Sequence, residues 1–197
     1  MNLTDQFKTV TQKASIDCDA YICKADQVVD VLTFLRDKQG YSMLVDLTAI
    51  DNGVDASPRF TAVYHVLNLE TKSYLRLCTD CIGDETPVIP TVSSVYAAAN
   101  WHERETYDMF GIHFENHPDM RRILMWDDYP YHPLRKEFPL AGIEVEYPAA
   151  DVVERTGVKV DAAPMAGGPF VAATSGPMSS KEPKAKDQSW RENRKKN

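Results

Sequence analysis

The chain has 197 residues, of which 43% are hydrophobic, so it suits one domain of ordinary size with extensions. Its formal net charge is −7, but residues 181–197 carry a net +4 and the remainder −11, and such an acidic body argues against nucleic acid as a partner. Because no apolar run approaches the roughly 18 residues of a membrane span and no secretory signal opens the chain, we expect a cytoplasmic protein that reaches a membrane only through partners.

The first clear elements in chain order are a helix and a strand. Residues 26–39 place four apolar side chains on one helical face, and Gly40 follows where a helix end favours glycine. Residues 43–50 then predict a strand. The apolar positions of the helix are Val28, Val31, Leu32 and Leu35.

A β-hairpin is expected next. Residues 59–69 alternate as a strand does, and both faces are fairly apolar, which is typical of a strand that is covered on each side or lies near the sheet centre. A short turn at 70–72 leads into a second strand at 74–81. His65 lies in mid-strand, where a packed or hydrogen-bonded histidine is the simplest interpretation.

Two helices are predicted before Gly111. Pro87 and Pro90 precede a short helix at 92–98, and a second begins at Asn100, which has capping-box spacing to Glu103. Arg104 and Asp108 stand four residues apart and are expected to pair on a solvated or partner-facing helix. Residues 1–111 therefore predict an α+β domain: a small sheet with a hairpin, packed by a few helices.

After Gly111 the pattern changes to an extended arm. Residues 112–140 contain repeated X-Pro steps, which favour extended backbone. They also combine aromatic side chains with arginine, the residue types that dominate binding energy at interfaces. We interpret Arg121, Arg122, Arg135 and Lys136 as interface anchors rather than solvated charges. Residues 141–197 are rich in Pro, Ala and Gly and end in a basic tail, which predicts disorder in the free chain.

Four cysteines raise the question of a metal or cluster. Cys18 and Cys23, then Cys78 and Cys81, have spacings that invite a zinc or iron–sulfur interpretation. The second pair lies at the end of a predicted strand, where residues three apart point to opposite faces. Unpaired thiols are therefore the default expectation.

Catalytic patterns are weak. Glu103, Glu105 and Asp108 could serve acid–base chemistry, but capping and ion pairing explain them more simply. A His-Glu-x-x-His zinc motif fails because Thr106 takes the second histidine position. His113 and His117 are four apart but lie outside a predicted helix, and no phosphate-binding or dinucleotide glycine motif is present.

Residues 101–139 carry a family resemblance. In order, they contain Glu103-Arg104-Glu105, Tyr107-Asp108-Met109-Phe110-Gly111-Ile112, His117-Pro118, Arg122-Ile123-Leu124 and Pro133-Leu134-Arg135-Lys136-Glu137-Phe138-Pro139. These motifs resemble the C-type subunit of NADH-quinone oxidoreductase, which is the 30-kDa subunit of respiratory complex I. The likeness covers roughly residues 25–140 and departs from the family at Tyr131, where a glycine is usual.

The resemblance implies a non-catalytic scaffold subunit in the peripheral arm of a proton-translocating complex, on the cytoplasmic face of the cell inner membrane. It implies contacts with subunits D (49-kDa-like) and B, while FMN and iron–sulfur clusters belong to other subunits. We expect no catalytic, cofactor-binding or metal residue in this chain. The residues expected to dock partners are Glu103, Arg104, Glu105, Asp108, Arg121, Arg122, Trp126, His132, Arg135 and Lys136.

Two other classes stay open. One is the equivalent subunit of a related membrane-bound hydrogenase or of a complex with another electron donor. The other is an independent acid–base or metal enzyme built on Glu103, Glu105, Asp108 and the histidines.

Overall fold

The computed structural model describes residues 3–138, 171–172 and 176–177. The chain divides into two compact units, Met1–Lys136 and Glu137–Asn197. The second unit contains one short antiparallel pair, β8 (Val171–Ala172) with β9 (Gly176–Pro177). The rest of the tail predicted over 141–197 lies outside the described residues.

The first unit consists of a mixed sheet with helices. Its elements are α1 (Leu3–Gln6), β1 (Thr11–Lys13), β2 (Asp19–Cys23), the 3-10 helix η1 (Ala25–Gln27), α2 (Val28–Gln39), β3 (Met43–Asp51), β4 (Phe60–Asn68), β5 (Ser73–Asp80), β6 (Val88–Pro90), α3 (Ala99–Phe110) and β7 (His113–Glu115). Five strands form a sheet in the order β1-β2-β5-β4-β3, in which only the β2–β5 pair is parallel. The predicted α+β class is confirmed.

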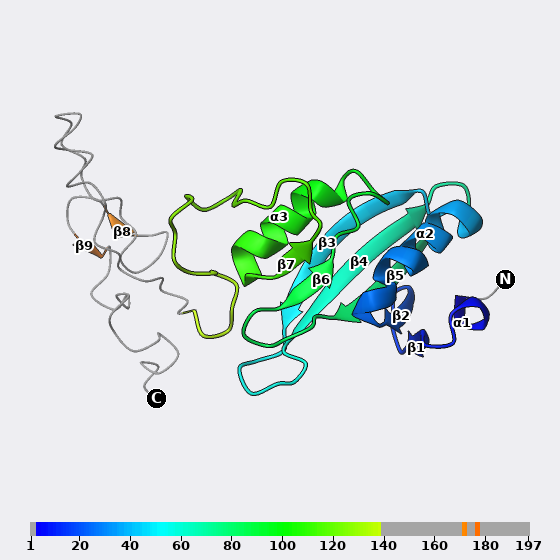
Figure 1. Ribbon diagram of the computed structural model, residues 1–197, viewed down its shortest axis with the longest axis horizontal. Coiled ribbons are helices and arrows are strands. Elements are labelled where there is room, and N and C mark those ends of the chain that lie inside the picture. The colour runs from blue at the N-terminus through cyan, green and yellow to red at the C-terminus, as the bar shows by residue number, and fades with distance from the viewer. Residues whose placement is uncertain (1–2, 139–170, 173–175, 178–197) are drawn as a thin grey trace. The chain divides into compact units, whose positions relative to one another are not determined.

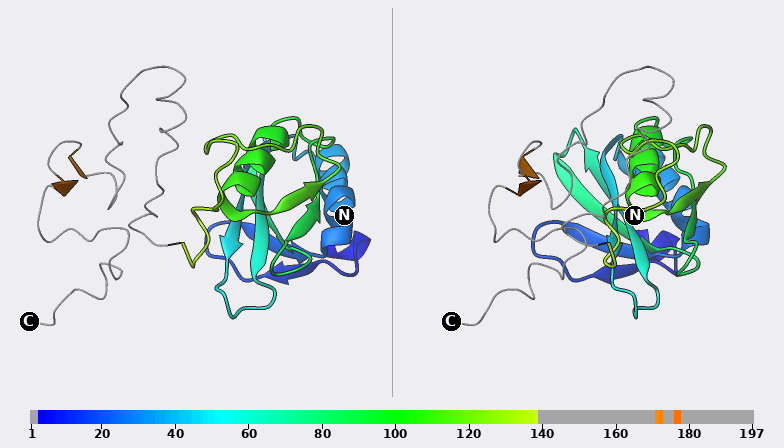
Figure 2. Two further views of the ribbon diagram at one scale, coloured as in Figure 1. Left: turned by 60° about the vertical axis from the view of Figure 1, so that its left-hand side comes forward. Right: turned by 90° about the vertical axis from the view of Figure 1, so that its left-hand side faces the viewer.

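Both long helices, α2 and α3, cover the same face of this sheet (Figures 1 and 2). The buried face of α2 carries the four apolar residues that its periodicity indicated, and Gly40 ends the helix at a φ of 76°. Alternate residues of β4 pack against the helices in one core, namely Phe60, Ala62, Tyr64 and Val66. The alternation of strand side chains thus directs one face to the helices, while the opposite face still buries Val63 and Cys78 at its centre.

The predicted hairpin is β4 and β5, which pair antiparallel from Thr61–Asp80 to Asn68–Ser73. The Asn68 side chain accepts the backbone N–H groups of Glu70 and Thr71, which shapes the turn. Its amide nitrogen donates to the Gln39 carbonyl at 2.9 Å, so the turn also fixes the end of α2.

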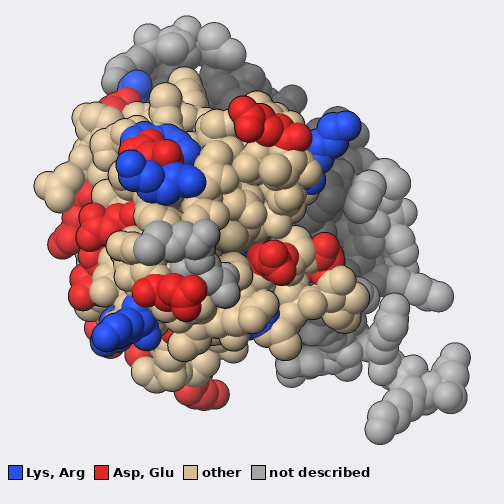
Figure 3. Space-filling model, turned by 90° about the vertical axis from the view of Figure 1, so that its right-hand side faces the viewer, with Lys and Arg blue, Asp and Glu red and all other residues tan. Residues whose placement is uncertain are grey.

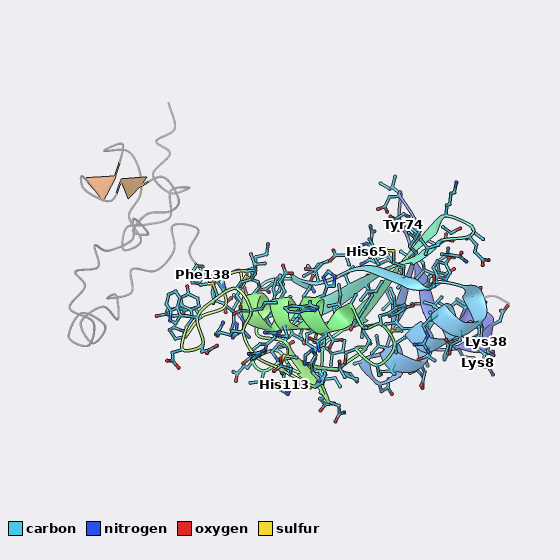
Figure 4. The ribbon with its side chains drawn as sticks, turned by 90° about the horizontal axis from the view of Figure 1, so that it is seen from above. Lys8, Lys38, His65, Tyr74, His113 and Phe138 are labelled. Atoms are coloured by element: carbon cyan, nitrogen blue, oxygen red, sulfur yellow. The ribbon has the colours of Figure 1, made fainter. Side chains whose placement is uncertain are left out.

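The opposite face of the sheet is polar at its centre. His65 and Tyr74 lie on the side of the sheet away from the helices, and His113 lies on the helix side (Figure 4). Arg76 Nε donates to His65 Nε2 at 2.8 Å, which confirms the hydrogen-bonded interpretation of this histidine. Burial and the neighbouring Arg76 lower the pKa of His65, and the bond requires its neutral form. On the face drawn in Figure 3, charged groups are scattered among uncharged residues, and acidic groups gather along the left edge of this view.

Two local predictions were wrong. Residues 92–98 form turns instead of a helix, and α3 begins at Ala99 with Ala98 as its N-cap and no side-chain cap. Asn100 and Glu103 therefore make no capping box. Strands β1 and β2 were not predicted, since three and five residues without marked alternation leave little periodic signal.

The segment expected as a separate arm belongs to the first compact unit as far as Lys136. Its beginning forms β7, which pairs in parallel with β6. Residues 122–136, which we call the strap, have no helix or strand and run along α3 (the yellow-green loop of Figure 1). Gly111 therefore ends a helix without ending the domain.

Candidate functional site: α3 and the strap

Helix α3 carries charged residues that are buried. Glu103 and Asp108 are 0% exposed and Arg104 is 6% exposed, although the sequence predicted a solvated or partner-facing helix. Charged groups are buried at little net cost only where hydrogen bonds replace water. The strap and the turn before α3 supply those bonds.

Asp108 binds the start of the strap. One of its carboxylate oxygens, Oδ2, accepts the backbone N–H groups of Ile123, Leu124 and Met125 at 3.0, 2.7 and 2.9 Å. The other, Oδ1, accepts Nη1 of Arg122 at 2.5 Å. Burial alone would raise the pKa of Asp108, but these donors outweigh it and hold the pKa below its usual range.

Arg104 and Arg122 bind backbone carbonyls. Arg104 donates to the carbonyls of Arg121 and Arg122, each at 3.2 Å, so its predicted i,i+4 partnership with Asp108 is absent from the bonds of the described residues. Arg122 donates to the carbonyls of Tyr129 and Tyr131 at 2.5 and 3.2 Å. Each guanidinium thereby fixes the path of the strap.

The end of the strap caps the C-terminus of α3. A helix leaves its last carbonyls without partners. Here His132 Nδ1 binds the Asp108 carbonyl at 2.9 Å, and the Leu134 N–H donates to the Met109 carbonyl at 3.0 Å. Arg135 Nε donates to the Phe110 carbonyl at 2.7 Å, and its positive charge suits this negative end of the helix dipole.

Gly111 permits this close approach. Its φ is 75°, and a Cβ atom there would lie 2.5 Å from Arg135 Nη2 and 2.7 Å from the His132 ring. A side chain at this position would strain the backbone and would also force the capping side chains of Arg135 and His132 to shift.

A second carboxylate, Asp51 at the end of β3, holds the last residue of the strap. It binds Arg59 in a bidentate pair, with N–O distances of 3.1 and 2.9 Å, and accepts the Lys136 N–H at 2.8 Å. Burial raises the pKa of Asp51, but Arg59 and the amides of Lys136 and Gly53 outweigh burial and lower that pKa to about 2. The bond between Asp51 and the Lys136 amide was not predicted from the sequence, because nothing in the Asp51-Asn52-Gly53 turn indicates a partner 85 residues away.

Glu103 is held differently, by the turn before α3. It accepts the Val92 N–H at 2.7 Å and the Thr91 hydroxyl, and His117 Nε2 lies 3.8 Å away. Burial raises its pKa to about 7, against the opposing effect of these two neutral donors. Burial also disfavours the charged form of His117, which for a histidine lowers the pKa.

Large apolar side chains project outward from the strap and the flank of α3. We call them the apolar strap surface: Trp101, Leu124, Trp126, Tyr131 and Leu134, which are 37–63% exposed. Trp126 packs edge-to-face on Tyr129 with ring centroids 4.5 Å apart, and Tyr129 packs on Tyr131. Exposed aromatic groups on a rigidly held backbone have the character of binding hot spots.

The ten residues predicted to dock partners thus fall into three groups. Glu105, Arg121, Trp126 and Lys136 are exposed, and their role in docking stays a prediction. Glu103 and Asp108 are enclosed within this chain and cannot reach a partner directly. Arg104, Arg122, His132 and Arg135 are at most partly exposed and hold the strap to α3. The sequence did not separate outward from inward side chains in these segments.

Within the described part of the chain, no three His, Cys, Asp or Glu residues gather as a metal site requires. All four cysteines are free thiols, and burial raises the pKa of Cys81 to about 12. The carboxylates proposed for acid–base catalysis on the buried side of α3 have their oxygens occupied by the donors described above. Among the same residues, no helix has the length and apolarity needed to cross a bilayer.

The family follows from comparison with known proteins. The model of the family described as "Respiratory-chain NADH dehydrogenase, 30 Kd subunit" matches residues 21–144, more than half of the chain. The fold and this match define a component of a respiratory-chain NADH dehydrogenase. More particularly, the chain belongs to the 30-kDa family, the C-type subunits of NADH-quinone oxidoreductase, or complex I.

Relatives that bear this name are similar over the same region. The C-type subunit of NADH-quinone oxidoreductase from Geobacter sulfurreducens is 46% identical over 121 residues, which are 61% of this chain and 74% of the relative. A longer NADH-quinone oxidoreductase protein of a Sulfurihydrogenibium species, whose name joins subunits C and D, is 43% identical over 121 residues but is covered over only 20% of its length.

Two solved structures share the fold. A trypsin-resistant fragment of Nqo5 aligns with a TM-score of 0.51 at 26% identity and covers 58% of this chain and 92% of the fragment. A chain of the membrane-bound sulfane sulfur reductase, an archaeal respiratory membrane complex, aligns with a TM-score of 0.60 at 23% identity and covers 80% and 89%. The second likeness shows a common fold alone.

Proposed function

We propose that this chain is a scaffold subunit in the peripheral arm of a proton-translocating NADH-quinone oxidoreductase, on the cytoplasmic face of the cell inner membrane. It binds no cofactor itself; FMN and iron–sulfur clusters in other subunits carry electrons from NADH to quinone. Its contribution is positional, because electron transfer and quinone access depend on neighbours that are held rigidly. Its partners are subunits D (49-kDa-like) and B, and it contacts the membrane only through the complex.

The observation that carries this proposal is the apolar strap surface. Trp126 and Leu134 are 50% and 53% exposed, yet both stand on held backbone. Trp126 directly follows the three amides that bind the Asp108 carboxylate, and the Leu134 N–H donates to the Met109 carbonyl of α3. Little conformational entropy is then lost when a partner covers them, which favours binding. Exposed apolar side chains on a preorganised segment are what a docking subunit needs.

A partnership with the 49-kDa-like subunit has separate support. The longer Sulfurihydrogenibium relative contains the matched region within one polypeptide, and its name includes both subunits C and D. Two modules that share one polypeptide stay at high effective concentration, an arrangement that suits modules that bind each other. We extend that partnership to this chain as part of the proposal.

A second candidate is the equivalent subunit of a related membrane-bound hydrogenase or other-donor complex. This candidate has support from the fold that the chain shares with a chain of an archaeal respiratory membrane complex. The two candidates differ in which proteins accompany the chain, so one purification distinguishes them.

The test is affinity purification of the tagged chain from native membranes, followed by identification of the co-purifying subunits. We expect subunits D and B with wild type, and a loss of both with Trp126→Ala, since an interface anchor of this type commonly contributes about 2 kcal/mol or more. Tyr74→Ala is the matched control, because Tyr74 is 48% exposed but lies on the open face of the sheet. Hydrogenase subunits in place of D and B would favour the second candidate. Equal losses of partners with Trp126→Ala and Tyr74→Ala would show that the strap is not part of the interface.

A further inference from the structure

The strap is held to the domain mainly by side chains. Four of its backbone N–H groups donate to carboxylates: those of Ile123, Leu124 and Met125 to Asp108, and that of Lys136 to Asp51. One further strap amide, that of Leu134, donates to a backbone carbonyl of α3. The ladders that join β3, β4 and β5, by contrast, run over eight paired positions on each side of β4.

The strap also contributes little to the core. Among its side chains only Tyr129 is buried, and only the partly buried Met125 packs against the main core cluster, whose buried residues all come from other segments. Segments with few buried apolar contacts open at lower free energy than the strands of a core. The strap therefore has the composition of a unit that opens by itself.

Besides the bonds of His132, Leu134 and Arg135 to the end of α3, the strap is held by carboxylates at two points. Asp108 gathers the amides of 123–125 and the Arg122 guanidinium at one end. Asp51, itself fixed by Arg59, holds the amide of Lys136 at the other end. Charge-assisted bonds are stronger than neutral ones, so removal of one charge weakens several contacts together.

We propose that the strap is a conformational device: a segment that is closed by the Asp108 and Asp51 carboxylates and opens as one unit while the sheet and α2 stay folded. Opening releases residues 122–136 and disperses the apolar strap surface. The effect of opening on docking rests on the proposed function, whereas the opening itself is a property of the free chain. The docking surface is thus lost at a lower free energy than the one needed to unfold the sheet and α2.

The test is amide hydrogen exchange of the purified full chain, compared with Asp108→Asn and Asp51→Asn. In wild type, the amides of 123–125 should exchange together and faster than those of β4 and β5. Asp108→Asn should accelerate them roughly tenfold to a hundredfold, as expected for loss of hydrogen bonds to a charged group, and leave the β4 and β5 amides unchanged. Asp51→Asn should accelerate exchange of the Lys136 amide by a similar factor and also leave the β4 and β5 amides unchanged.

Asp37→Asn is the matched control, because Asp37 is an exposed aspartate of α2 that pairs with the adjacent Arg36. It should leave exchange in the strap unchanged. Trypsin provides a second readout, since an open strap exposes the bonds after Arg122 and Arg135. The proposal is overturned if strap amides exchange only with those of the sheet, if either variant accelerates β4 and β5 equally, or if Asp108→Asn fails to fold.

Discussion

At the scale of single residues, two buried carboxylates on one helix have opposite properties. Asp108 and Glu103 are both 0% exposed. Asp108 receives three amide donors and an arginine, so its charged form is favoured and its pKa falls. Glu103 receives one amide and one hydroxyl, so burial dominates and its pKa rises to about 7. Glu103 is also the more deeply buried of the two, so the donors and the depth of burial together decide the outcome.

This difference predicts how pH acts on stability through Glu103. A carboxyl group whose pKa is raised on folding favours the folded state at low pH, and that contribution is lost as pH rises from the ordinary value of 4.5 through about 7. The loss is on the order of 3 kcal/mol in the free energy of unfolding. Glu103→Gln keeps the shape and the bond from the Val92 N–H, while its NH2 group donates to the Thr91 oxygen instead of accepting from that hydroxyl. The variant has no carboxyl group to titrate and should abolish this dependence.

Urea unfolding of wild type and Glu103→Gln at pH 5 and pH 8 measures the effect. The comparison with the variant matters because the nearby His117, whose pKa is lowered by burial, contributes with the opposite sign as pH rises through 6.5. The variant should lose less stability than wild type between the two pH values. If wild type and variant lose the same stability between pH 5 and pH 8, Glu103 is ionised in the folded state at both pH values.

At the scale of elements, the sequence predicted those whose signals are local. The apolar stripe of α2 and the glycines that end α2 and α3 were predicted correctly, because periodicity and positive φ leave marks in neighbouring residues. The strap was interpreted as part of an extended partner-docking arm, because its bonds to Asp108 and Asp51 join residues 14 to 85 positions apart. Burial of Glu103 and Arg104 was missed for the same reason, since a charged residue normally indicates solvent.

The strap ends in Arg135 and Lys136, adjacent residues with different expected roles. Arg135→Ala removes a charge-assisted bond to the Phe110 carbonyl and the packing of the guanidinium over Phe60, 5.2 Å from the ring centroid. It should cost the isolated chain about 1.5–3 kcal/mol of unfolding free energy. Lys136→Ala keeps the backbone bond to Asp51 and removes an exposed side chain, so it should change stability by less than about 0.5 kcal/mol.

Chemical denaturation of both purified variants is the measurement. A similar, small effect for the two would show that Arg135 is an outward anchor, as the sequence alone suggested, and that the capping of α3 by the strap is energetically unimportant.

At the scale of the whole molecule, the structure combines a sheet domain with a separately held surface. Buried charges of α3 and β3 fix the strap, and the strap presents Trp126 and its neighbours to the outside. In the 30-kDa family of complex I, this arrangement supports the proposal that the chain positions its partners and performs no chemistry. Assembly and turnover should therefore respond differently to a change at the surface.

The most direct measurement is NADH-quinone turnover per assembled complex in membranes that carry Trp126→Ala, with assembled complex quantified separately. We expect a smaller amount of complex, because an anchor worth about 2 kcal/mol is lost, and an unchanged turnover rate for each complex that forms. Full assembly with a reduced turnover rate would contradict the scaffold role, because Trp126 would then act in the reaction and not in docking.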